Sequence, residues 1–297
     1  MANNEQILDE WLAKLPEELR QEVKSRLLKS INYVPKIGIM GKSGAGKSTL
    51  INTILEKNAC QTGGVGGCTR AFQEEEILIN GHKIIFMDLP GVAENSARHS
   101  EYSELYAKKI KDLDLILWVI KVDDRANKND EEFYKELIQY YDKSRILFVL
   151  SQCDKAEPSR DFDWNQFQPS ERQLTIIEQN QQRVARDFNV SKEDVLTIAC
   201  DFYEGKFNNW NIPKLITRII AKVPSEAKSP ILRAVPESNK TLESKKEAKS
   251  AFRTMVDEIF DVVVDVLPIP APVRTIAKKA KDVIVDAAEK VWDFFFG

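Results

Sequence analysis

The stretch that decides the fold reads Gly41-Lys42-Ser43-Gly44-Ala45-Gly46-Lys47-Ser48. It matches the pattern G-x-x-x-x-G-K-[ST] without a gap. The apolar run 35–40 before it predicts a buried strand, and the run 49–55 after it predicts a helix. A strand, a loop of small residues and a helix N-terminus together turn successive N–H groups toward a phosphate. The stretch therefore predicts a nucleotide-binding loop.

Each residue of this loop has an expected task. The backbone N–H groups would surround the phosphate oxygens, and Lys47 would reach the terminal phosphates and serve catalysis. The Ser48 hydroxyl would bind Mg²⁺. We expect the nucleotide to contact Gly41, Lys42, Ser43, Gly44, Ala45, Gly46, Lys47, Ser48 and Thr49.

Composition narrows the class of protein. The chain has 297 residues, a net charge of -3 and 43% hydrophobic residues, which is typical of a globular domain with an appendage. The negative net charge argues against a generally nucleic-acid-binding surface. No cysteine pair has metal-ligand spacing, so we expect reduced thiols. The chain shows no signal-peptide pattern and no apolar run that spans a bilayer, which predicts a cytoplasmic protein.

Strand-like and helix-like segments alternate after the loop. Apolar runs predict strands at 72–79, 83–87, 113–120, 145–150 and 194–199. Amphipathic patterns predict helices at 130–141, 170–188 and 211–223. The alternation predicts a three-layer α/β domain with a mostly parallel sheet over residues 34–223. Together with the loop pattern, this domain resembles the Ras-like G domain of P-loop NTPases.

Both chain ends predict helices. Residues 1–33 have two helical patterns separated at Pro16, and residues 250–297 have two amphipathic patterns separated by a proline-rich break. We expect a helical module built from both ends. Residues 224–249, rich in Lys, Glu, Ser and Pro, predict a linker. Because acidic residues dilute the basic face of the last helix, we favour its packing in the module over peripheral membrane contact.

Two further motifs predict a metal and γ-phosphate site. Asp88-Leu89-Pro90-Gly91 fits D-x-x-G at the end of a strand, so that Asp88 would hold Mg²⁺ through water and the Gly91 N–H would sense the γ-phosphate. Thr69 lies in the loop before the second strand and would close on Mg²⁺ in the triphosphate state. The expected metal residues are Ser48, Thr69 and Asp88, and the expected catalytic residues are Lys47, Thr69 and Gly91.

The stretch Ser151-Gln152-Cys153-Asp154 indicates which nucleotide base the protein binds. It stands in the place of the motif [NT]-K-x-D, and the Asp154 carboxylate would accept two hydrogen bonds from guanine. Adenine would leave that carboxylate unpaired, which is costly. Gln152 would cover the base with its stem, Lys155 follows one position late, and the Ala199 N–H would meet the guanine oxygen. The motifs predict GTP and GDP as ligands, and the altered motif leaves an ATP-binding P-loop NTPase open.

Read in order, these motifs give the chain a resemblance to Era-like bacterial and prophage-encoded P-loop GTPases of the TRAFAC class, with a 50S ribosome-binding-type GTPase domain. The matching stretches are 41–52, 68–70, 87–92, 113–126 and 148–158. The flanking helices resemble those of immunity-related GTPases. The resemblance implies a guanine-nucleotide switch with slow Mg²⁺-dependent hydrolysis of GTP to GDP and phosphate, acting on an unidentified protein or ribonucleoprotein effector.

Two departures concern hydrolysis. Val92 stands where Ras-like switches carry the glutamine that orients the attacking water, so the water must be positioned otherwise. Gly44 stands where potassium-activated relatives carry asparagine, so we expect no activation of that kind. Arg70 and Arg125 are candidate stabilisers of developing charge, in cis or across a nucleotide-dependent dimer. An assembly- or membrane-associated GTPase that uses the terminal helices is the alternative.

Overall fold

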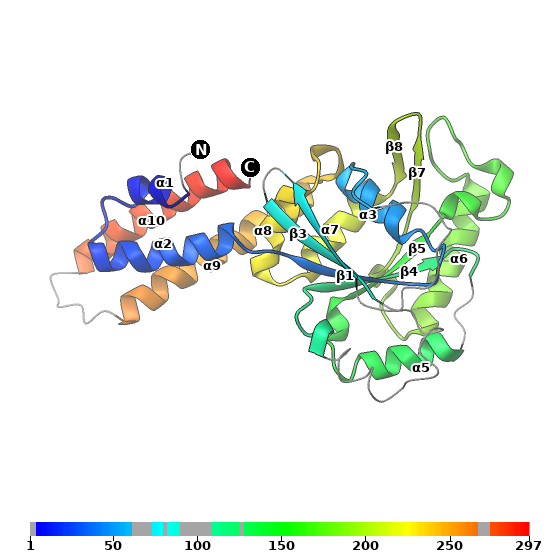
Figure 1. The fold of residues 1–297 in the computed structure, drawn as a ribbon, viewed down its shortest axis with the longest axis horizontal. Helices are drawn as coiled ribbons and strands as arrows, with labels where there is room; N and C mark the ends of the chain where they lie inside the picture. The colour runs from blue at the N-terminus through cyan, green and yellow to red at the C-terminus, as the bar shows by residue number, and fades with distance from the viewer. Residues whose placement is uncertain are drawn as a thin grey trace.

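The computed structural model describes residues 4–60, 73–79, 82–89, 108–124, 128–266 and 274–296. A six-stranded sheet with flanking helices forms one end of the molecule, and a group of helices forms the other end (Figure 1). Only the pair β2–β3 is antiparallel, and the other pairs are parallel. The strand order is β2 (Gln73–Ile79), β3 (His82–Asp88), β1 (Lys36–Met40), β4 (Leu115–Lys121), β5 (Ile146–Ser151) and β6 (Val195–Thr197). This confirms the predicted mostly parallel sheet.

The two faces of the sheet bury alternate side chains. In β4, Leu115, Leu117 and Val119 enter one core, whereas Ile116, Trp118 and Ile120 enter the other. The first core includes α3 (Lys47–Leu55) and α7 (Ile212–Lys222), and the second includes α5 (Lys128–Leu137) and α6 (Glu171–Asp187). Because helices cover both faces, β4 is apolar along almost its whole length, as in other buried parallel strands. The three-layer α/β prediction is confirmed.

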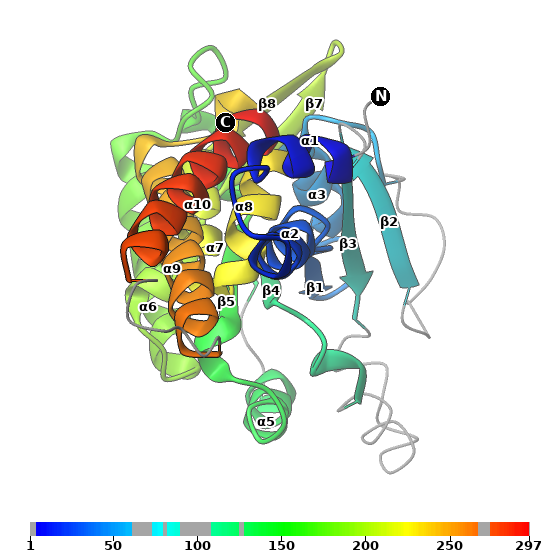
Figure 2. The ribbon, with the colours of Figure 1, turned by 90° about the vertical axis from the view of Figure 1, so that its left-hand side faces the viewer.

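Helices from both chain ends pack together, as predicted (Figure 2). They are α1 (Asn4–Trp11), α2 (Glu17–Ile31), α9 (Leu242–Val266) and α10 (Arg274–Phe295). Pro16 lies immediately before α2, where its fixed φ suits a helix start. Val291 and Phe295 of α10 are buried in the same core as Leu12 and Leu27. The apolar face of α10 is therefore used for packing. Within the described ranges, no helix combines the length and apolarity needed to cross a membrane.

The segment 224–249, which we predicted as a linker, is largely helical. It contains α8 (Ser225–Ala234), the short helix η6 (Glu237–Asn239) and the first turns of α9. Ala227 and Ile231, four residues apart, are buried on one face, and Lys228 pairs with Glu247 at 2.5 Å. The polar composition concealed this apolar stripe, because the charged residues pair with each other instead of facing only water. The exact domain boundaries stay predictions.

A hairpin that we did not predict follows β6. It consists of β7 (Ala199–Tyr203) and β8 (Lys206–Trp210). Glu204 and Gly205 at its tip both have positive φ, of 48° and 78°. Two positive φ values suit a tight hairpin turn, but Glu-Gly is a weaker turn signal than Asn-Gly. By contrast, Asn80-Gly81 between β2 and β3 is a strong turn signal in the sequence, and these two residues lie outside the described ranges.

One buried side chain ties the sheet domain to the C-terminal helices. Asn239 is fully buried, and its Nδ2 donates to the carbonyl oxygens of Thr53 (3.2 Å) and Ile54 (3.3 Å). These carbonyls lie in the last turn of α3, where intrahelical donors run out. α3 begins at the glycine-rich loop, and its C-terminal end is bonded to the segment that leads into α9. Asn239 therefore connects the helix that starts at the loop to the C-terminal helices.

Removing this cap is expected to destabilise the fold. We predict that Asn239→Ala lowers the free energy of unfolding by about 1–2 kcal/mol, because buried carbonyls lose their donor. Urea denaturation followed by circular dichroism measures the change. Ser238→Ala is the control: this exposed neighbour donates only to the Glu56 side chain, so its loss should cost less than about 0.5 kcal/mol. Equal losses in the two variants would contradict the capping role.

Candidate functional site

The glycine-rich loop joins the carboxyl end of β1 to the start of α3. A Cβ atom on Gly41 would lie 2.2 Å from the carbonyl oxygen of Val119 in β4, so only glycine fits there. Gly46, at φ 90°, is the N-cap of α3. The N–H groups of the first helical turn therefore lack intrahelical acceptors and carry the positive end of the helix dipole. This arrangement suits an anion such as a phosphate group.

The two lysines of the loop are oriented differently. Lys47 Nζ donates to the Gly41 carbonyl oxygen at 2.8 Å and lies 3.9 Å from Asp88 Oδ1. Its ammonium group thus lies over the loop. Lys42 Nζ instead pairs with Asp124 at 3.4 Å and Asp130 at 3.5 Å. Lys42 would therefore meet a phosphate through its backbone rather than its side chain.

Two oxygen side chains at this edge suit a magnesium ion. Ser48 lies in the first turn of α3, and Asp88 ends β3, where the Leu89 N–H donates to the Ile39 carbonyl of β1 at 2.7 Å. Mg²⁺ takes oxygen ligands and usually binds through one or two protein groups together with substrate phosphates and water. Within the described part of the chain, no group of three or more His, Cys, Asp or Glu residues could hold a metal by itself. The donor set therefore fits Mg²⁺ bound with a nucleotide.

Two hydrogen bonds hold the end of β5 against the loop. Ser151 is 4% exposed, and its Oγ donates to the Ala45 carbonyl oxygen at 2.7 Å. Gln152 Nε2 donates to the Gly44 carbonyl oxygen at 2.7 Å. These residues stand where the usual motif has Asn or Thr and then Lys. Each replacement keeps a hydrogen-bond donor, and the donor is directed at the loop.

The same segment carries Asp154 toward Ala199. Asp154 lies in the short helix η3 (Cys153–Lys155), and the Cys153 N–H donates to the Ile198 carbonyl oxygen at 3.0 Å. Ala199, next in sequence, is fully buried at the start of β7. Burial raises the pKa of the Asp154 carboxyl above the usual aspartate range. Lys155 Nζ donates to Gln152 Oε1 at 2.8 Å, so Lys155 orients Gln152.

The structure thus gathers most of the predicted residues at one edge of the sheet. The loop and the first turn of α3 hold Gly41, Lys42, Ser43, Gly44, Ala45, Gly46, Lys47, Ser48 and Thr49. The ends of β3 and β5 and the start of β7 add Asp88, Gln152, Asp154, Lys155 and Ala199. Several predicted residues lie outside the described ranges, namely Thr69, Arg70, Gly91, Val92 and Arg125. The roles of all these residues stay predictions.

Sequence reasoning missed two supporting side chains. Gln173 of α6 is fully buried and donates to the carbonyl oxygens of Ala156 (2.9 Å) and Asp154 (3.4 Å), which fixes the segment after β5. Asn52 of α3 accepts from the Cys60 N–H at 2.8 Å and donates to the Cys60 carbonyl at 2.8 Å. The detectable signals were a capping-box spacing at Ser170 and an asparagine among apolar helix residues.

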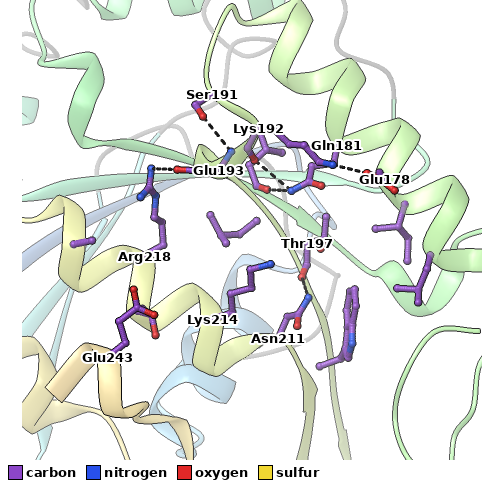
Figure 3. Close-up of a pocket in the computed structure, with 17 residues that line it drawn as sticks. Glu178, Gln181, Ser191, Lys192, Glu193, Thr197, Asn211, Lys214, Arg218 and Glu243 are labelled. Carbon is purple, nitrogen blue, oxygen red and sulfur yellow. Dashed lines mark hydrogen bonds and ion pairs between the residues drawn. The ribbon is translucent and has the colours of Figure 1, made fainter. Parts of the chain in front are cut away.

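A hollow of about 750 Å³ lies beside the edge strand β6, between α6 and α7 (Figure 3). The side chain of Gln181 donates to the Val195 carbonyl at 2.6 Å, and that of Asn211 donates to the Thr197 carbonyl at 3.1 Å. Lys192 pairs with Glu178 at 2.5 Å. The carbonyls of Val195 and Thr197 and the charges of Lys192 and Glu178 thus already have partners. In the sheet, β4 and β5 lie between β6, beside the hollow, and β1, which leads into the glycine-rich loop. It is not part of the candidate site.

Comparison with protein families agrees with the geometry. A family model described as a 50S ribosome-binding GTPase matches residues 36–152. The chain is 36% identical over 281 residues to the uncharacterized protein YfjP of Escherichia coli K12, covering 92% of this chain and 93% of YfjP. It is 34% identical over 288 residues to the uncharacterized protein YkfA of the same organism, covering 96% of each chain.

Among solved structures, Era from Aquifex aeolicus bound to GDP and AlF₄⁻ is similar to this chain with a TM-score of 0.44 and 22% sequence identity. The similarity covers 68% of this chain and 66% of Era.

Loss of the Ser151 hydroxyl is expected to destabilise the loop. We predict that Ser151→Ala lowers the free energy of unfolding by about 1–3 kcal/mol, because the buried Ala45 carbonyl loses its donor. Urea denaturation without nucleotide measures this loss. Ser250→Ala, at an exposed helix position, is the control and should stay within about 0.5 kcal/mol of the wild type. A similarly small change in Ser151→Ala would mean that this bond does not hold the loop.

Proposed function

Because the chain belongs to the bacterial P-loop GTPases, in one family with YfjP and YkfA, we propose that it is a nucleotide-controlled switch that binds GTP and GDP with Mg²⁺ and hydrolyses GTP slowly to GDP and phosphate. One observation carries the proposal. The glycine-rich loop and the Ser151–Asp154 segment are held together by the two 2.7 Å hydrogen bonds from Ser151 and Gln152. A phosphate site and a base site are thereby fixed relative to each other.

The phosphate side of the site has defined tasks for each residue. The N–H groups of the loop and of the first turn of α3 bind the phosphate oxygens, and Lys47 neutralises their charge. Ser48 and Asp88 hold Mg²⁺, Asp88 through water. When bound, the ion neutralises charge on the β- and γ-phosphates. Thr69 and Gly91 complete the γ-phosphate contacts in this proposal.

The base side selects guanine through Asp154. Its carboxylate accepts hydrogen bonds from the N1–H and the exocyclic amine, and the Ala199 N–H donates to the guanine oxygen. Gln173 and the Cys153 N–H hold the backbone on which these groups are placed. Gln152, bonded to Gly44 and Lys155, covers the edge of the base with its stem. Adenine presents a mismatched edge, so the family assignment and this geometry both disfavour an ATP-binding protein.

The helical module is the proposed output of the switch. The loop continues into α3, and Asn239 bonds the far end of α3 to the segment leading into α9. α2 and α8 also pack against each other and share the core of the sheet domain. A change at the loop is thus transmitted through rigid, packed elements to the surface that an unidentified protein or ribonucleoprotein effector contacts. We place this function in the cytoplasm.

An assembly- or membrane-associated GTPase would need apolar surface on the terminal helices. Val291, Phe295 and Phe296 are buried, which disfavours that alternative, and only Val285 and Phe294 are exposed among the large apolar side chains described in α10. A nucleotide-dependent dimer stays compatible with the site, since its loop edge faces away from the helical module (Figure 1).

Replacing the base-reading carboxylate tests the proposed function. We predict that Asp154→Asn binds GDP about 100-fold more weakly, because two charge-assisted hydrogen bonds are lost, and that it gains affinity for xanthosine diphosphate, whose base can accept from the amide. Calorimetric titration with each nucleotide measures both effects. Asp161→Asn, an exposed position in the following loop, is the control and should bind as the wild type does. Unchanged selectivity in Asp154→Asn would refute the base-reading role.

The partly buried Asp154 carboxyl also predicts a pH dependence. Burial raises the pKa of Asp154, so its protonated form becomes populated at a higher pH than for an ordinary aspartate. Because only the ionised form accepts both hydrogen bonds, the affinity for GDP should fall on acidification. The fall should begin at a higher pH than for an ordinary aspartate, whose pKa is about 4. The GDP dissociation constant, measured across pH while the protein stays folded, tests this. The decline should be absent in Asp154→Asn, and its persistence there would assign it to another group.

A further inference from the structure

Lys121, the last residue of β4, reaches the middle of the glycine-rich loop. Its backbone is in register with Ser151 of β5, whose hydroxyl donates to the Ala45 carbonyl. The position that a Cβ atom would take on Gly44 lies 3.7 Å from Lys121 Nζ and 3.9 Å from Lys121 Cε. Since Gly44 has no side chain, the ammonium group has room beside the loop backbone.

The charges around the loop distinguish Lys121 from its neighbours. Lys47 lies 3.9 Å from Asp88, and Lys42 is engaged by Asp124 and Asp130. The carboxylate of Asp124, in the turn after β4, is thus paired with Lys42. Lys121 makes no ion pair within 4 Å with any residue in the described ranges. A lysine placed against a phosphate-binding loop without a carboxylate partner in this part of the chain is suited to an anionic ligand.

From this placement we propose that Lys121 is a second phosphate-contacting cation of the site, in addition to Lys47. The proposal rests on the proposed function and deepens it. During hydrolysis, a water oxygen bonds to the γ-phosphorus, and the bond from that phosphorus to the β–γ bridging oxygen breaks. The bonding electrons stay on GDP, and the proton of the water leaves with the phosphate. Lys121 takes no proton in this step and stabilises the negative charge on the phosphates.

The Lys121 ammonium lies beside the loop at Gly44, the position at which potassium-activated relatives carry asparagine. Lys121 would supply positive charge there from the protein itself. The backbone of Lys121 is held by the parallel pairing of β4 with β5, so its side chain starts from a fixed point beside the loop before nucleotide binds. The sequence did not single out this lysine, because it ends an apolar strand and belongs to none of the nucleotide-binding motifs.

The test compares Lys121→Met with Lys121→Arg and with Lys206→Met, an exposed lysine in β8. Single-turnover hydrolysis of saturating Mg²⁺–GTP, affinity for GDP and for a non-hydrolysable GTP analogue, and the unfolding midpoint without nucleotide are measured for each. We expect Lys121→Met to hydrolyse at least about tenfold more slowly and to bind the triphosphate analogue more weakly, with an unchanged unfolding midpoint. Lys121→Arg should retain most of the rate, and Lys206→Met all of it.

The outcomes separate this proposal from the proposed function. If the wild type binds and hydrolyses GTP and Lys121→Met stays within about twofold in rate and affinity, Lys121 does not contact the phosphates. If Lys121→Met loses rate only because its unfolding midpoint falls, the residue is structural and the proposal is also overturned. If the wild type binds no guanine nucleotide, the proposed function fails together with it.

Discussion

The structure depends on the contact between the glycine-rich loop and the end of β5. A loop of this kind has few side chains with which to hold its own shape, and its glycines take backbone conformations that other residues avoid. Ser151 and Gln152 supply the missing restraint from a neighbouring strand, each through a 2.7 Å hydrogen bond to a loop carbonyl. Parallel pairing of β1, β4 and β5 places these groups at one edge, where we propose a phosphate site and a base site.

The helical module extends this restraint to the rest of the molecule. Its apolar side chains join the core on the α3 and α7 face of the sheet, so the module is not a separate body on a tether. Asn239 and α8 provide the junction, with Arg233 of α8 donating to the Ile31 carbonyl of α2 at 3.2 Å. The two chain ends are far apart in sequence, but both are needed to cover the same apolar surface. In the proposed switch, a movement of α3 would therefore displace residues of the module.

Much of the fold was predictable because its local signals agree. The continuous apolar run of β4, the break at Pro16 and the loop pattern each indicated one structure. The hairpin after β6 was missed because Glu204-Gly205 is a weak turn signal. Helix α8 was missed because its charged residues concealed Ala227 and Ile231. At the site, motifs predicted the residues that we propose contact a ligand. Gln173 and Lys121 depend on contacts between segments that are apart in sequence, which spacing along the chain does not show, and Asn52 depends on a contact with the loop that follows its own helix.

We propose that a site with Ser151 and Gln152 in place of the usual asparagine and lysine still selects guanine. Competitive titration of the purified wild-type protein with GDP and ADP in Mg²⁺ measures this selectivity. GDP should bind at least about 100-fold more tightly than ADP, since only guanine satisfies the Asp154 carboxylate. Equal affinities, or tighter binding of ADP, would contradict it.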